Sequence, residues 1–265
     1  MGVEIISGDI TDRKSLGKLN TYKFALVFHC AGYVENSNPE NLKKVNIVGT
    51  RNICEFTLAQ GVERLVYLST VAVVSGNKEV PLKEDLPFYA TNIYGESKLQ
   101  AEKIVWEYRA KGLKVVILRP PMIYGEDEPH LMKLLLKLLK IRMLPLVNDG
   151  ISKLHLAYVE NVVAAMIFCL DKPECLKDSF FVADKEVLTT GEIFHIFAQA
   201  IGAEPPCLLP KPIESILLNF PFVGKKLKFF IKDRVYSTQK LEALGFKPPY
   251  PAKDSLLKSA QKLYF

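Results

Sequence analysis

The sequence predicts an α/β fold in which a parallel sheet is covered by helices on both faces. Short runs rich in β-branched and aromatic residues alternate with longer helical patterns through the first half of the chain, as in repeated βαβ units. These runs are almost continuously apolar, which is typical of strands buried on both faces. The length of 265 residues is sufficient for one large core with a smaller lobe.

The first half supplies the strands and two long helices. The expected strands are Val3 to Ile6, Phe24 to Phe28, Leu65 to Leu68 and Val115 to Leu118. The first long helix should have Asn38 as its N-cap, Pro39 at its first position and its end at Gly61, because proline fits where an N–H would be unpaired. The second should run from about Ile93 to Lys111.

The pattern loosens after about residue 125, where we place a smaller, mostly carboxy-terminal lobe. Its expected elements are helix Leu131 to Ile141, a strand near Leu154 to Leu156, helix Val159 to Leu170 and helix Thr190 to Ile201. A proline-rich loop region follows at Pro205, Pro206, Pro210 and Pro212. We therefore expect two domains, residues 1–125 and 126–265, with some segments of the second returning to the first.

Composition narrows the class of protein. Apolar residues make up 49% and charged residues 24%, so the chain should be globular. The net charge of +6 comes from scattered lysines, and no nucleic-acid partner is expected. The five cysteines form no CxxC pair and the four histidines are dispersed, which indicates reduced thiols and no metal site. The sequence shows no signal-peptide layout and no membrane-spanning stretch, so a cytoplasmic location is expected.

The segment YGESK, from Tyr94 to Lys98, carries the main chemical signal. A spacing of four on a helix puts both side chains on one face. A free phenol has a pKa of about 10, and an adjacent ammonium favours the phenolate, so such a pair can move a proton. The pattern YxxxK alone also fits an ordinary pair on a helix surface, and its meaning depends on its context.

That context is a series of segments in a fixed order, each near the carboxyl end of an expected strand, where an open α/β sheet binds its ligand. They are GDITD (8–12), HCAG (29–32), VNIVGT (45–50), LST (68–70), YGESK and RPPMIYG (119–125). With the later LHLAYVENVV and RVYSTQKLEALGFKP, they make the chain resemble the extended short-chain dehydrogenase/reductase family over nearly its whole length. The resemblance implies a Rossmann-type doubly wound parallel sheet, a substrate lobe, and NAD or NADP as cofactor.

The resemblance also implies which residues border the cofactor. These are Asp9 and Ile10 at the adenine, Ala31, Gly32 and Asn46 in the cleft, and Pro121 and Met122 beside the nicotinamide. Three of them have simpler alternatives. Asp9 would equally end a strand through a side-chain turn, Asn46 would equally be a polar helix residue, and Gly32 a turn glycine.

For the chemistry, the resemblance implies that Tyr94 exchanges the substrate proton while Lys98 holds the nicotinamide ribose and lowers the tyrosine pKa. Thr70 or Ser69 would hydrogen-bond the substrate oxygen. The segment after Thr70 is one residue longer than the family's usual spacing, so Ser75 stays open as well, and Thr70 is favoured.

The chain departs from the family at its beginning. The family opens with a strand and a glycine-rich turn resembling GxxGxxG, which binds the cofactor pyrophosphate, and this sequence contains no such turn. We therefore expect an amino-terminally incomplete sheet and a truncated form of a longer enzyme, with a natural short form as the alternative. The sheet would then pair Val3 to Ile6 directly with Phe24 to Phe28, or expose apolar edges.

The turn RPPMIYG favours an apolar substrate. Nucleotide-sugar epimerases and dehydratases often carry an asparagine for the substrate diphosphate where this chain has Met122. The sequence looks more like the 3β-hydroxysteroid dehydrogenase and dihydroflavonol reductase branch, which implies an NAD(P)-dependent oxidoreductase acting on a CH–OH or ketone group. The alternatives are a nucleotide-sugar epimerase or dehydratase, and a non-catalytic binding protein of the same fold.

Two further partners besides a small-molecule substrate are considered. The segment from Ile213 to Phe230 mixes apolar residues with Lys225, Lys226 and Lys228. This pattern suits peripheral membrane contact or an apolar entrance to the substrate site, and it equally suits a lobe helix packed on the core. The resemblance alone implies a homodimer formed through the Tyr94 helix and the helix from Asn38 to Gln60.

Overall fold

The computed structural model describes residues 3–129 and 131–265, with the backbone alone at 177, 221–223, 225 and 226. The chain divides into two compact units. The first contains the residues up to Lys78 together with 84–119 and 166–180, and the second contains 79–83, 120–165 and 181–265. No helix in the described part of the chain is both long and apolar enough to cross a bilayer.

The first unit contains the main sheet. Its strands are β1 (Leu26–His29), β2 (Arg64–Leu68), β3 (Val115–Arg119) and β7 (Ser179–Phe181), in the order β1-β2-β3-β7. The first three run parallel, with Val66 of β2 opposite Phe28 and Val116. All five residues of β3 are buried, as expected for a strand covered on both faces. The predicted α/β fold with a parallel sheet is thus confirmed.

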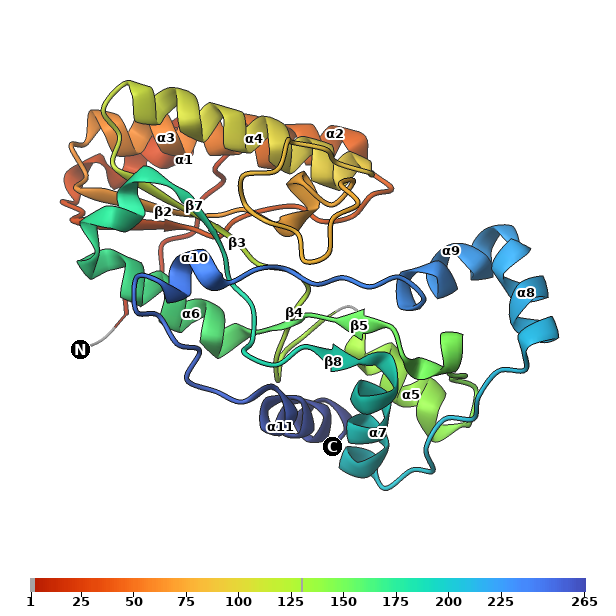
Figure 1. The fold of residues 1–265 in the computed structure, drawn as a ribbon. Helices are drawn as coiled ribbons and strands as arrows, with labels where there is room; N and C mark the ends of the chain where they lie inside the picture. Colours follow the sequence, from red (N-terminus) through yellow and green to blue (C-terminus); the bar gives the residue numbers. More distant parts are fainter. Residues whose placement is uncertain (1–2, 130) are drawn as a thin grey trace. The chain divides into compact units, whose positions relative to one another are not determined.

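Two long helices cover one face of this sheet and lie side by side in Figure 1. One is continuous through α2 (Pro39–Asn41), η2 (Leu42–Gly49) and α3 (Thr50–Ala59), and the other is α4 (Ile93–Ala110). The shorter elements of this unit are α1 (Arg13–Gly17), η1 (Lys18–Thr21), η3 (Val71–Val73), η5 (Cys169–Asp171) and η6 (Pro173–Lys177). The side chain of Asn38 caps the first helix, as predicted, but η2 has the wider π-helical turn, which sequence patterns do not reveal.

The expected strand from Val3 to Ile6 was wrong. These residues form no ladder, and the side chains of Val3 and Ile5 are 91% and 92% exposed. Strand propensity alone does not hold a strand that packs against nothing. Among the described residues β1 pairs only with β2, and Phe28 of β1 is 43% exposed. Of the two outcomes expected for the sheet, the exposed apolar edge is the one observed.

The second unit is built from short strands and packed helices. Its strands are β4 (Ile123–Tyr124), parallel to β6 (Ala157–Tyr158), and β5 (Lys153–Leu154), antiparallel to β8 (Leu188–Thr189). Its helices are α5 (Met132–Lys140), α7 (Thr190–Ile201), α8 (Lys211–Asn219), α9 (Pro221–Phe230), α10 (Gln239–Glu242) and α11 (Ala252–Tyr264), with the short turn η4 (Asn148–Gly150). α6 (Val159–Phe168) begins here and ends in the first unit.

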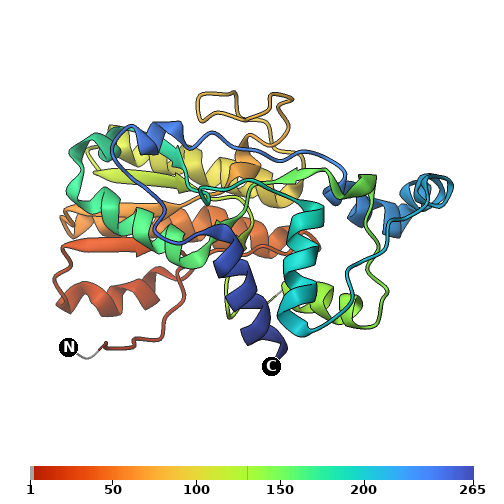
Figure 2. The same cartoon turned by 60° about the horizontal axis from the view of Figure 1, so that its bottom comes forward.

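Helices α5, α7 and α11 pack on one another to form the core of the second unit, and α7 and α11 lie side by side in Figure 2. The sequence specifies α7 at both ends. Thr189 and Glu192 form a reciprocal capping box at its start, and Gly202 ends it in the left-handed region at φ 58°. These local signals explain why the predicted bounds of this helix match the observed ones.

Candidate active site

The first turn of α4 lies close to the end of β2. Asn92 caps the helix, since its side-chain oxygen accepts a hydrogen bond from the Gly95 N–H at 2.7 Å. Gly95 permits a close approach, because a Cβ there would lie 3.0 Å from the carbonyl oxygen of Ala72 in η3. Because η3 begins directly after Thr70, the close contact between η3 and the first turn of α4 also places Thr70 near Tyr94.

Thr70 lies beside the phenol of Tyr94. Its hydroxyl accepts from the Ala72 N–H at 3.2 Å and is close enough to the phenol to affect its pKa. Burial raises the pKa of Tyr94 above its usual value, and the Thr70 hydroxyl opposes that rise. The phenol is therefore protonated at neutral pH, which suits it to donate a proton.

The other two candidate hydroxyls have different partners. Ser69 is buried and its hydroxyl donates to Glu102 Oε2 at 2.7 Å. The Ser75 hydroxyl donates to the carbonyl oxygen of Ala72 at 3.2 Å. Of the three hydroxyls left open by the sequence, the one that the described contacts bring to Tyr94 is that of Thr70.

Lys98 lies one turn after Tyr94 and is only 4% exposed. Its ammonium donates to the carbonyl oxygen of Leu68 at 2.8 Å and lies 4.3 Å from the ring centre of Tyr67. Burial lowers the pKa of Lys98 to about 7, against the opposing effect of Glu102. A lysine with this pKa is neutral at the pH where a phenol ionises. Burial raises the pKa of Tyr94, and the lowering expected from Lys98 stays a prediction.

A buried ion pair beside these residues was not predicted from the sequence. Glu102 and Arg119 are 0% and 3% exposed, and the Arg119 Nε donates to the two carboxylate oxygens at 3.1 and 3.2 Å while its Nη2 also contacts Oε1. Arg119 Nη1 donates to the Glu84 carbonyl oxygen at 2.9 Å. With the Ser69 hydroxyl, the pair ties α4 to the ends of β2 and β3. The available signal was the position of Glu102, four residues after Lys98 on the same helix.

The residues predicted at the adenine lie in an exposed turn before α1. Asp9 Oδ1 accepts from the Thr11 N–H at 2.8 Å, which forms the side-chain turn considered as the simpler alternative and lowers the Asp9 pKa. Ile10 packs on the helix, since a Cβ on Gly49 would lie 2.6 Å from its Cδ1. The Asp9 carboxylate is solvent-exposed and can accept further hydrogen bonds.

The residues predicted along the cleft differ in accessibility. Ala31 and Gly32 are exposed after β1. Asn46 is 1% exposed, and its side chain accepts from the Tyr33 N–H at 2.7 Å and donates to the Tyr33 carbonyl and the Ser97 hydroxyl. Asn46 thus fixes the loop after β1 to α4.

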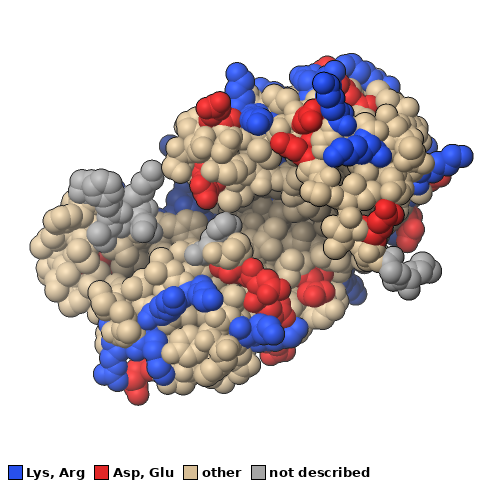
Figure 3. Space-filling model, turned by 180° about the vertical axis from the view of Figure 1, so that it is seen from behind, with Lys and Arg blue, Asp and Glu red and all other residues tan. Residues whose placement is uncertain are grey.

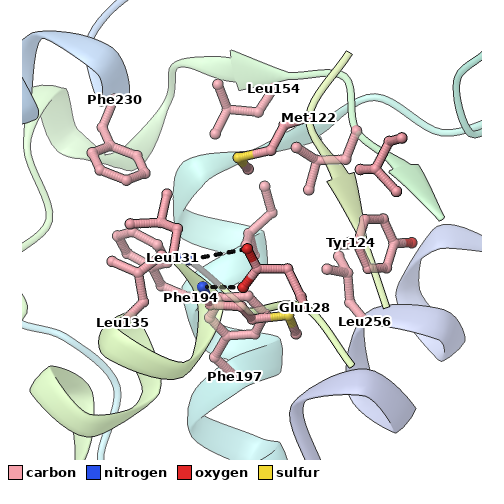
Figure 4. Close-up of a pocket in the computed structure, with 14 residues that line it drawn as sticks. Met122, Tyr124, Glu128, Leu131, Leu135, Leu154, Phe194, Phe197, Phe230 and Leu256 are labelled. Atoms are coloured by element: carbon pink, nitrogen blue, oxygen red, sulfur yellow. Dashed lines mark hydrogen bonds between the residues drawn. The ribbon is translucent and has the colours of Figure 1, made fainter. Parts of the chain in front are cut away.

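Pro121 and Met122 belong to the second unit. Pro121 is buried, and Met122 is half-buried and lines an apolar pocket shown in Figure 4. Glu128 is the charged residue among those drawn, and its carboxylate accepts from the N–H groups of Leu131 and Met132 at 3.0 and 2.8 Å. The remaining lining residues are Ile123, Tyr124, Leu135, Leu154, Leu156, Ile193, Phe194, Phe197, Phe230 and Leu256.

The cavity volume is about 30 Å³, room for roughly one or two water molecules. A larger apolar group would therefore have to displace the half-buried side chains that line it, which include Met122, Leu131 and Phe230. Because nearly all lining atoms are apolar, the pocket favours hydrocarbon over a charged ligand.

The residues of the first unit fit a nicotinamide dinucleotide in the chemistry of their donors and acceptors. The described contacts give the Lys98 ammonium one hydrogen-bond acceptor, although it carries three N–H groups. The exposed Asp9 carboxylate and the exposed backbone at Ala31 and Gly32 add groups that hydroxyls and amides can bind. Lysine and arginine side chains do not concentrate on the face shown in Figure 3, where blue and red atoms are interspersed.

Comparisons with known proteins agree with this chemistry. A family model described as the NAD dependent epimerase/dehydratase family matches residues 2–183. UDP-glucose 4-epimerase of Vibrio cholerae is 29% identical over 89% of this chain and 76% of that protein. The decarboxylating sterol-4-alpha-carboxylate 3-dehydrogenase erg26 of Schizosaccharomyces pombe is 26% identical over 89% of this chain and 76% of that protein. RMD from Pseudomonas aeruginosa, solved in complex with NADPH, has the same fold, with a TM-score of 0.79 at 19% identity, over 99% of this chain and 89% of that one.

Proposed function

Since the chain belongs to the NAD dependent epimerase/dehydratase family, we propose that it is an NAD(P)-dependent oxidoreductase acting on a CH–OH or ketone group of an apolar substrate. The observation that carries the proposal is the placement of Tyr94 beside Thr70 and one helical turn before the buried Lys98 on α4. The apolar pocket that includes Met122 supports the substrate class. The resemblance to the extended short-chain dehydrogenase/reductases is confirmed by the family match.

In this proposal each residue has a limited task. Tyr94 donates its proton to a substrate ketone, or accepts one in the reverse direction, and Thr70 holds the phenol in place. Lys98 binds ribose hydroxyls with the N–H groups that Leu68 does not use. Asp9, Ala31 and Gly32 bind the rest of the cofactor, which when bound supplies the hydride chemistry.

A substrate comparison tests the proposal. The purified chain is supplied either with NADH or NADPH and a 3-keto sterol, where the loss of reduced cofactor is measured, or with oxidised NAD and UDP-glucose, where the formation of UDP-galactose is measured. We expect net oxidation of the cofactor with the sterol, abolished by Tyr94→Phe, because the variant lacks the transferable proton. Epimerisation of UDP-glucose without net cofactor turnover would favour the epimerase alternative instead, whose support is the Vibrio cholerae relative.

The non-catalytic alternative makes a different prediction. If the chain only binds a ligand, Tyr94→Phe should leave its binding and its cellular function unchanged. The homodimer and the cytoplasmic location expected from the sequence remain proposals. For the dimer, Val48 of η2 and Ile93 of α4 expose 41% and 43% of their surface, and sedimentation velocity of Ile93→Glu against the unmodified chain would test whether that face is used.

A further inference from the structure

Helices α8 and α9 carry an exposed apolar stripe. Ile213, Ile216 and Phe220 are 47%, 61% and 58% exposed, and their spacing of three and then four residues places them on one side of α8 and its end. Leu208, just before the helix, is 59% exposed. A soluble helix normally turns such a stripe towards its own core.

The stripe is not the face that attaches the hairpin to its own unit. Glu214 lies on the other side of α8, is 8% exposed and accepts from the Asn148 N–H at 3.1 Å. Lys211 forms an ion pair with Asp149 at 2.8 Å. The two helices also pack tightly on each other, because a Cβ on Gly224 would lie 2.2 Å from the carbonyl oxygen of Leu218. The inner surfaces of the hairpin are thus in use, while the side chains of the stripe stay about half exposed.

The charge of this segment identifies the kind of partner. Between residues 211 and 233 the sequence contains five lysines and two acidic residues, so the segment keeps a net positive charge even with Lys211 paired to Asp149. Two copies meeting through this segment would bring like charges together. An anionic bilayer surface offers hydrocarbon to the stripe and negative charge to the lysines.

The same hairpin reaches the apolar pocket. Phe230, the last residue of α9, is one of the residues that line it, and Phe229 beside it lies under the Arg234 guanidinium at 4.4 Å. One short segment therefore contributes both an exposed apolar stripe and a wall of a pocket suited to hydrocarbon. This combination suits an apolar compound that partitions into membranes.

We propose that the α8–α9 hairpin docks the protein peripherally on an anionic membrane surface through Ile213, Ile216 and Phe220. The docking itself needs only the geometry of the second unit. Its use for substrate entry rests on the proposed function, so the test measures membrane binding without any enzymatic readout.

Co-sedimentation with vesicles tests the docking. The full chain is mixed with phosphatidylcholine vesicles that contain phosphatidylserine, and with vesicles of phosphatidylcholine alone. We expect binding to the anionic vesicles that weakens as salt is raised, and at least a roughly tenfold loss of affinity for Ile216→Glu, because a carboxylate would face the bilayer. Ile167→Glu is the matched control, since Ile167 of α6 is 56% exposed outside the hairpin, and it should bind as the unmodified chain does.

A second measurement locates the inserted residue. Trp106 is the chain's one tryptophan and lies on α4, so Phe220→Trp in a Trp106→Phe background places a single fluorophore at the hairpin. We expect blue-shifted emission on adding anionic vesicles and quenching by brominated lipid. Equal binding of Ile216→Glu and the unmodified chain, an unshifted emission, or a dimer that Ile216→Glu dissociates would each overturn the proposal.

Discussion

Neutralising Glu102 should destabilise the protein strongly, because it would leave a buried cation without its partner. Glu102→Gln keeps the shape of the side chain, so no cavity arises. Arg119 is 3% exposed and its guanidinium stays charged. Breaking one side of a buried ion pair costs about 3–5 kcal/mol, and since the glutamine oxygen can still accept a hydrogen bond, we expect about 3 kcal/mol. That is a large part of the roughly 5–15 kcal/mol that holds a domain together.

Urea denaturation followed by circular dichroism measures this loss, and a second substitution isolates its cause. If the cost comes from the unpaired charge, Arg119→Met added to Glu102→Gln should recover part of the stability. Glu107→Gln is the control on the same helix, since Glu107 is 46% exposed and pairs with Lys111 at the surface, where such pairs contribute about 0.3–0.5 kcal/mol. A loss below about 1 kcal/mol for Glu102→Gln, or strictly additive losses in the double variant, would refute the reasoning.

Three further predictions follow from single contacts. Burial lowers the pKa of Lys98 from 10.5 to about 7, so between these pH values the folded chain binds fewer protons than the unfolded chain. The free energy of unfolding should therefore rise with pH across that window by up to about 1.4 kcal/mol per pH unit. In urea titrations Lys98→Met should remove this slope, and an unchanged slope would contradict the burial argument. Thr70→Val should raise the pKa of Tyr94 further, because it removes the hydroxyl that lowers this pKa. The pKa is measured from phenolate absorbance as the difference between the Thr70→Val variant and the same variant with Tyr94→Phe added. Ser69→Ala is the control and should leave the Tyr94 pKa unchanged, because the Ser69 hydroxyl contacts Glu102. Thr189→Ala should cost about 1 kcal/mol through loss of the α7 capping box, and Thr189→Ser should cost little; equal losses for the two would argue against the cap.

Local signals explain which parts of the fold could be predicted from the sequence. Helix α7 was predicted with the correct ends because Thr189 and Gly202 fix them through contacts within a few residues. The strand predicted from Val3 to Ile6 is not present in the structure. A strand forms only beside a neighbouring strand, and an apolar run in the sequence does not show whether such a neighbour exists. The π-helical turn of η2 is likewise invisible in the apolar pattern, although Asn46 lies within it.

The site shows the same division between local and long-range information. The spacing of Tyr94 and Lys98 follows from helix geometry and needs no structure. The pairing of Glu102 with Arg119 joins α4 to the end of β3. The sequence alone does not indicate that this glutamate and this arginine form a pair, because they lie on different elements. The choice among Ser69, Thr70 and Ser75 likewise depended on long-range and turn contacts. The Ser69 hydroxyl donates to the Glu102 carboxylate and the Ser75 hydroxyl to the Ala72 carbonyl, while the Thr70 hydroxyl accepts from the Ala72 N–H.

Burial, more than proximity, decides the ionisation of the Tyr94 and Lys98 pair. A spacing of four residues suggests an ammonium that stabilises a phenolate, but that effect requires the lysine to keep its charge at alkaline pH. In the structure the same burial raises the pKa of Tyr94 and lowers that of Lys98 to about 7, so each group favours its neutral form. A protonated phenol beside Thr70 is already in the state needed to give a proton to a ketone oxygen. The reverse reaction would need the phenolate, and hydrogen-bond acceptors added around Lys98 would favour that form because they stabilise the ammonium beside it.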